Sequence, residues 1–79
     1  MNATELTALL AEGLEVEPST LTPETRIADV DEWNSIGWLT IMSLVDERLG
    51  VVISSKDIRG FTTVGDVLEY LGARAAAKR

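Results

Sequence analysis

The sequence predicts an all-α fold: an irregular four-helix bundle with three main helices, one short helix and a long loop between the first and second. Apolar residues recur at helical spacing in three stretches, residues 3–14, 36–49 and 64–71, and capping residues precede them. Both prolines fall between the first two stretches, in residues 15–33. We therefore expect residues 1–79 to form a single domain, with a basic tail over residues 73–79 that is frayed or else extends the last helix by a turn.

The composition restricts the chemistry of the chain. Its 79 residues include no cysteine and no histidine, so thiol nucleophiles, disulfides and the commonest general base are missing. We expect no enzyme, no catalytic residue and no metal site. The net charge of −6 disfavours nucleic acid and anionic membranes and favours partners with basic patches. With neither a signal peptide nor a membrane-spanning apolar run, we expect a cytoplasmic monomer.

The first helix and the loop after it have recognisable boundaries. Asn2-x-x-Glu5 has the form of a capping box, and Gly13 suggests a stop near the end of the helix. In the loop, residues 19–24 could form a short helical turn. Apolar residues at wide spacing should pin the loop to the core; they are Leu21, Ile27 and Val30.

The second helix is the most apolar segment, and Gly50 should end it. Ser35 should stand at its N-terminus with the hydroxyl facing water, where unpaired backbone N–H groups and the helix dipole favour an anion such as phosphate. The alternative is that Asn34 or Ser35 is only an N-cap. The core stripe of this helix is predicted as Ile41, Val45 and Leu49.

The last third of the chain should supply the short helix and the final main helix. Residues 51–53 are expected to connect elements and to bury Ile53. Ser54 or Ser55 could cap a turn through residues 56–59, ended by Gly60. The final helix should start at the capping box Thr63-x-x-Asp66. Its buried face is predicted as Val64, Val67, Leu68 and Leu71.

In order and spacing, these segments resemble an acyl carrier protein over nearly the whole chain. The family signature is an Asp-Ser-Leu triplet, often preceded by Trp in specialised members; here it stands as Trp33-Asn34-Ser35-Ile36. Asn34 replaces aspartate and Ile36 replaces leucine. A second part of the resemblance is the helix start Phe61-Thr62-Thr63-Val64-Gly65-Asp66.

The resemblance implies that a phosphopantetheinyl transferase attaches 4′-phosphopantetheine from coenzyme A to Ser35, between Asn34 and Ile36. The thiol of this arm would carry an acyl group as a thioester, loaded by an acyl- or aminoacyl-activating ligase. Downstream synthase or transferase enzymes of a specialised lipid or secondary-metabolic pathway would then receive it. Two alternatives remain: a peptidyl-type carrier loaded with an amino acid, and an unmodified carrier-fold docking protein.

The resemblance also implies roles for other residues. Partner enzymes would contact Leu39 and Met42 on the second helix, with Asp46 and Glu47 at its far end, although the first two could equally belong to the core. The helix has no acid between Ser35 and Asp46, so apolar contact should dominate recognition. The pocket for the acyl chain would involve Trp38, Ile53, Ile58 and Phe61. The bulk of Trp38 suggests small or polar cargo, or else plain packing.

Overall fold

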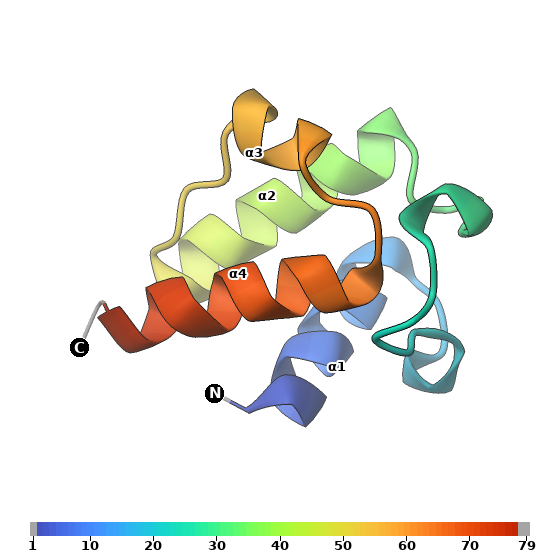
Figure 1. Ribbon diagram of the computed structural model, residues 1–79, viewed down its shortest axis with the longest axis horizontal. Helices are drawn as coiled ribbons and strands as arrows, with labels where there is room; N and C mark the ends of the chain where they lie inside the picture. The colour runs from blue at the N-terminus through green and yellow to red at the C-terminus, as the bar shows by residue number, and fades with distance from the viewer. Residues whose placement is uncertain (1, 78–79) are drawn as a thin grey trace.

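The computed structural model describes residues 2–77 and confirms the predicted all-α bundle (Figure 1). The main helices are α1 (Ala3–Leu14), α2 (Ser35–Leu49) and α4 (Val64–Ala77), and the short one is α3 (Ser55–Arg59). Two 3₁₀ turns, Pro18–Thr20 and Ile27–Asp29, interrupt the long loop. Within residues 2–77, every helix is too short or too polar to cross a bilayer.

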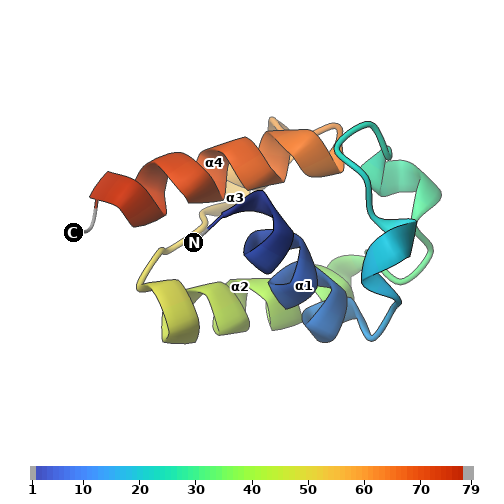
Figure 2. The same ribbon diagram turned by 90° about the horizontal axis from the view of Figure 1, so that it is seen from below.

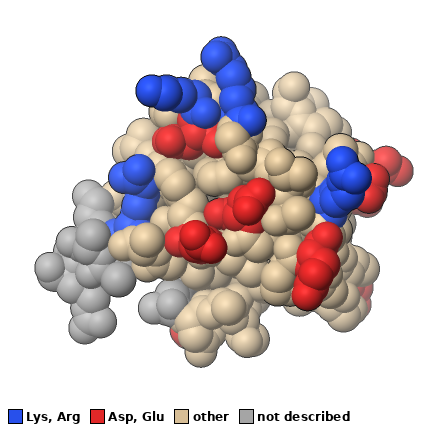
Figure 3. Space-filling view, in the orientation of Figure 1, with Lys and Arg blue, Asp and Glu red and all other residues tan. Residues whose placement is uncertain are grey.

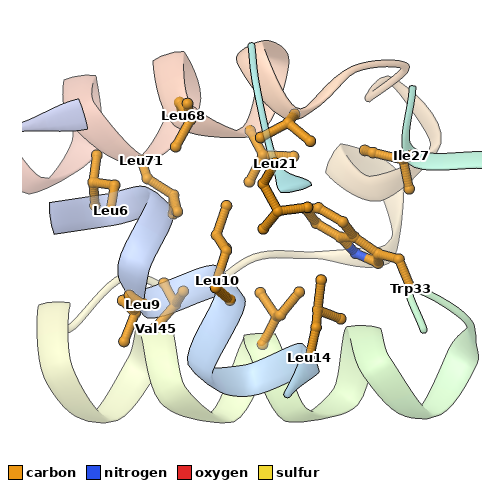
Figure 4. Packing of buried hydrophobic residues seen from close by; sticks show 14 of the residues in the cluster. Leu6, Leu9, Leu10, Leu14, Leu21, Ile27, Trp33, Val45, Leu68 and Leu71 are labelled. Carbon is orange, nitrogen blue, oxygen red and sulfur yellow. The ribbon is translucent and has the colours of Figure 1, made fainter. Parts of the chain in front are cut away.

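The three main helices enclose the core from different directions. In Figures 1 and 2, α2 and α4 run in the same direction, and both begin at the end where the long loop lies. Helix α1 runs across them the other way and contacts both. Figure 4 shows its leucines pointing between the other two helices. The most deeply buried side chains include Leu10, Val45, Val64, Val67 and Leu71.

Helix α1 begins and ends as predicted, and it stops one residue after Gly13. Asn2 and Glu5 form the capping box, with the Glu5 amide donating to Asn2 Oδ1 at 2.8 Å. The helix continues to Leu14, and Glu15 adopts the left-handed conformation, with φ of 59°. Gly13 lies within the helix, where an added Cβ would be 3.0 Å from Leu44 Cδ1. The glycine therefore permits close packing of α1 on α2.

The long loop is ordered because it is hydrogen-bonded to the start of α4. The amide of Ile27 donates to the Thr62 carbonyl, and the amides of Val64 and Gly65 donate to the carbonyls of Thr25 and Pro23. These bonds satisfy donors that a helix start leaves unpaired. The expected anchors Leu21 and Ile27 are buried and Val30 is half-buried. The predicted helical turn at 19–24 was misplaced, since the 3₁₀ turn is Pro18–Thr20.

At the end of the chain, the second of the two expected outcomes is observed for residues 73–77, which extend the last helix and do not fray. Helix α4 extends to Ala77, so residues 73–77 are helical, while Lys78 and Arg79 lie outside the described residues. The capping box at its start is present, since Thr63 Oγ1 accepts from the Asp66 amide at 3.2 Å. Arg74 also packs its guanidinium over the Tyr70 ring, 4.3 Å from the centroid.

A close approach of the loop fixes the first turn of α2. The loop carbonyl of Glu32 packs directly on the helix at Gly37, where an added Cβ would lie 2.4 Å from that oxygen. It would also lie 3.0 Å from Leu14 Cδ2 in α1. Real Cβ atoms do not tolerate the first distance. Only glycine at this position lets the loop, α1 and α2 meet.

Helix α3 is held to α4 by one carboxylate. Asp57 Oδ2 accepts hydrogen bonds from the Ser54 amide and hydroxyl and from the Tyr70 hydroxyl, the last at 2.7 Å. The hydrogen bond from Tyr70, followed by those from Ser54, lowers the pKa of the Asp57 carboxyl below its usual 3.8. Burial, and then Asp57 itself, raises the pKa of Tyr70. A single acceptor therefore joins the cap of α3 to α4.

Replacing Tyr70 with phenylalanine removes this hydroxyl but keeps the ring against Phe61. A lowered carboxyl pKa stabilises the fold above the unfolded pKa, and that stabilisation disappears as pH falls through the folded pKa. We therefore expect Y70F to melt a few degrees below the wild type at neutral pH, with the difference closing below pH 3.8. Thermal unfolding by circular dichroism checks this. If the difference in melting temperature between Y70F and the wild type does not change with pH, the lost stability comes from packing and not from the hydrogen bond to Asp57.

Replacing Gly37 with alanine should lower the free energy of unfolding by about 1–3 kcal/mol, because the new Cβ overlaps the Glu32 carbonyl. Gly72 is the matched control, since it lies within α4 and an added Cβ there meets nothing within 4 Å. G72A should be neutral or stabilising by up to about 1 kcal/mol. Urea unfolding of both variants measures the difference. Equal effects would refute the close-approach argument.

Candidate functional site

At the head of α2, the N-terminus of the helix, the residue that caps the helix is Asn34 and not Ser35. Asn34 is the N-cap, and its Oδ1 accepts from the Gly37 amide at 3.0 Å. Its amide nitrogen also makes a long contact of 3.5 Å with the Asp31 carbonyl. Ser35 is the first helical residue and is exposed, so helix α2 starts one residue before the predicted stretch. The Ser35 hydroxyl is therefore not needed for capping.

A groove of about 400 Å³ opens beside Ser35, between α2 and α3. On α2, positions 35, 38, 39 and 42 share one face because they are three or four residues apart. On α3, positions 55, 58 and 59 share a face for the same reason. The walls combine four apolar side chains with two hydroxyls and one cation. They are Ser35, Trp38, Leu39, Met42, Ser55, Ile58 and Arg59.

The floor of the groove continues into a row of aromatic rings. The Trp38 ring lies 5.1 Å from Trp33 and 5.9 Å from Phe61, centroid to centroid. Phe61 in turn meets Tyr70 edge-on at 5.3 Å. Such tilted, stacked and edge-on pairs add packing energy beyond area burial. The Trp33 side chain is buried, and its Nε1 has no hydrogen-bond partner within the described chain.

The structure brings together only part of the predicted acyl pocket. Trp38 and Ile58 line the groove beside Ser35. Ile53 is fully buried in the core. Phe61 is half-buried behind Trp38. Neither of these two is among the lining residues of the groove.

Of the remaining predicted site residues, some line the groove and others lie away from it. Leu39 is 65% exposed and Met42 half-buried, and both line it. Asn34 and Ile36 line a separate hollow of about 250 Å³ on the side facing α1. Asp46 and Glu47 are exposed near the far end of α2, about 16 Å along the axis from Ser35.

Ser55, Arg59 and Tyr70 are site residues that sequence reasoning missed. The i, i+3, i+4 spacing of positions 55, 58 and 59 could have placed the first two on one face with Ile58. The hydrogen bond between Tyr70 and Asp57 joins residues 13 positions apart in different helices, so no local sequence pattern predicts it.

The charges near the groove are mainly positive although the chain is acidic. Helix α3 carries Lys56 and Arg59, and Lys and Arg side chains gather over it at the top of Figure 3. Its one acid, Asp57, is engaged by Ser54 and Tyr70. Helix α2 offers no acid before Asp46. A helix N-terminus, an apolar trough and a cation together suit an anion joined to an apolar chain.

Comparison with known proteins agrees with this chemistry. The family described as "Phosphopantetheine attachment site" matches residues 4–71. The meromycolate extension acyl carrier protein of Mycolicibacterium aurum is 37% identical over 71 residues, covering 85% of this chain and 73% of that protein. The acyl carrier protein MbtL of Mycolicibacterium paratuberculosis is 31% identical, covering 95% of this chain and 84% of that protein.

A solved structure shows the same fold. The solution structure of a holo acyl carrier protein from Geobacter metallireducens superimposes with a TM-score of 0.82 at 19% identity, covering 98% of this chain and 88% of that one. The matched family segment runs from α1 into α4 and so includes the head of α2 and the groove. The chain therefore belongs to the phosphopantetheine-attachment family and is an acyl carrier protein.

Proposed function

We propose that Ser35 is the residue to which a phosphopantetheinyl transferase attaches 4′-phosphopantetheine from coenzyme A. The observation that carries this is an exposed hydroxyl at the head of α2, left out of the cap by Asn34 and opening on a groove. The N-terminus of the helix favours a phosphate there by about 0.3–1 kcal/mol. Once attached, the arm supplies a thiol that holds an acyl group as a thioester. For this function the chain therefore needs neither a cysteine nor a histidine of its own.

The groove walls support a role in holding the arm. Trp38, Met42 and Ile58 offer apolar surface along the path away from Ser35. Because Trp38 is stacked between Trp33 and Phe61, the space behind it is filled with aromatic side chains. This filling favours small or polar cargo lying along the groove.

The relatives support a specialised pathway. One is named for meromycolate extension, and MbtL is also named as an acyl carrier protein. By this likeness we assign the chain to a specialised lipid or secondary-metabolic pathway. Separately, we propose that it acts as a non-catalytic monomer in the cytoplasm. An activating ligase would load it, and a synthase or transferase would accept the acyl group.

Partner enzymes would dock on α2 mainly through apolar contact. Leu39 is 65% exposed beside Ser35, and Met42 continues the same face one turn later. Leu39 and Met42 both line the groove beside Ser35, so a partner that reaches Ser35 would contact these two side chains. Asp46 and Glu47 would supply charged contacts at the far end of the docking surface.

Ser35→Ala should abolish modification. Incubated with coenzyme A and a broad-specificity transferase, the wild type should gain the mass of one phosphopantetheine unit, and S35A should gain none. Ser55→Ala is the matched control, because Ser55 is an exposed serine at the first position of a helix lining the same groove. Intact-mass spectrometry measures the mass gained by the wild type, S35A and S55A. Modification that persists in S35A would exclude Ser35 as the attachment site.

Leu39→Glu should lower the kcat/KM of the transferase by about tenfold or more, equivalent to about 1.4 kcal/mol of lost transition-state binding. The fold should remain intact because Leu39 is 65% exposed. Val52→Glu is the control, since Val52 is 73% exposed in the connection between α2 and α3 and does not line the groove. If both variants slow modification equally, the effect is one of net charge and not of apolar docking.

A further inference from the structure

Arg59 is a cation on the groove wall, and within residues 2–77 it forms no ion pair with a carboxylate. Among the described residues, the ion pair is Arg48 with Glu12, at 2.7 Å, on another part of the surface. Arg74 lies over the ring of Tyr70. The Arg59 side chain takes part in none of the side-chain hydrogen bonds and ion pairs of residues 2–77, yet it lines the same groove as Ser35. Its charge therefore faces a space that a ligand can enter.

Asp57 is the acid on α3 that could neutralise Arg59, but its carboxylate is already hydrogen-bonded to other residues. Asp57 stands two residues earlier on α3, but its Oδ2 accepts from Ser54 and from Tyr70 on the side of α4. The opposite wall, α2, carries no acid between Ser35 and Asp46. The groove therefore combines apolar surface with a net positive charge, in a chain whose total charge is −6. That combination matches an anion joined to an apolar or weakly polar chain.

We propose that Arg59 binds the phosphodiester of the arm carried by Ser35 and thereby holds the arm in the groove. The inference rests on the proposed function, which places this anion beside the head of α2. A guanidinium suits the task because its donors are arranged as a planar fork that matches phosphate oxygens. Arg59 is thus a positioning residue that restrains the arm.

Spectra of the apo and holo proteins test the proposal without any partner enzyme. The backbone amide shifts of Ser55 and Ile58 are compared before and after attachment of the arm, in the wild type, Arg59→Gln and Lys56→Gln. Lys56 is the matched control, an exposed cation on the same helix that does not line the groove. We expect attachment to shift these amides in the wild type and K56Q, and the shift to fall by more than half in R59Q.

Ionic strength and cargo provide two further checks. Raising the salt from about 0.01 M to about 1 M shortens the screening length from about 30 Å to about 3 Å, so the shifts should shrink in the wild type and change little in R59Q. If the shifts appear only after a malonyl group is loaded, and not with the bare arm or an acetyl group, the anion is a carboxylate of the cargo and the proposal is wrong.

The outcomes separate this inference from the proposed function. Failure of Ser35 to gain mass would overturn the function. Full modification with equal shifts in R59Q and the wild type, or equal losses in R59Q and K56Q, would overturn only the role of Arg59. Matching apo spectra of the variants outside α3 would show that each is folded.

Discussion

The contact between the Glu32 carbonyl and Gly37 determines where the site can form. It stops the loop against the first turn of α2, while Leu14 of α1 closes the same position from the other side. With the helix start fixed, Asn34 takes the cap and Ser35 is directed to the surface. A side chain at position 37 would push the loop away and change the direction of the serine, however well the core was packed.

The two walls of the groove are supported in different ways. Helix α2 is fixed over its length by burial of Ile41 and Val45 against the core. Helix α3 has five residues, none of them fully buried, so its position depends on the half-buried Ile58 that packs against the core, on the connections at its ends and on the Asp57–Tyr70 bond. Short helices gain little stability of their own. The α2 wall is thus anchored in the core along the helix, whereas the α3 wall is attached at few points.

Sequence patterns predicted most of the fold because local signals agreed with it. Capping boxes at Asn2 and Thr63 and the left-handed Gly50 marked helix ends correctly. Gly13 correctly marked the end of α1 to within one residue, but its close packing against Leu44 is a contact that only the tertiary structure reveals. In the same way, the head of α2 was predictable from Asn34 and Ser35, while the second wall of the groove required the placement of α3. No local pattern relates Asp57 to Tyr70.

The pairing of the two tryptophans has a spectroscopic consequence. Trp33 and Trp38 are the only indoles in the chain, and their rings lie 5.1 Å apart. Trp33 is buried, whereas Trp38 also lines the groove beside Ser35. All indole emission therefore arises from one spot in the molecule, next to the serine. The intrinsic fluorescence of this protein is a label-free reporter of whatever enters the groove.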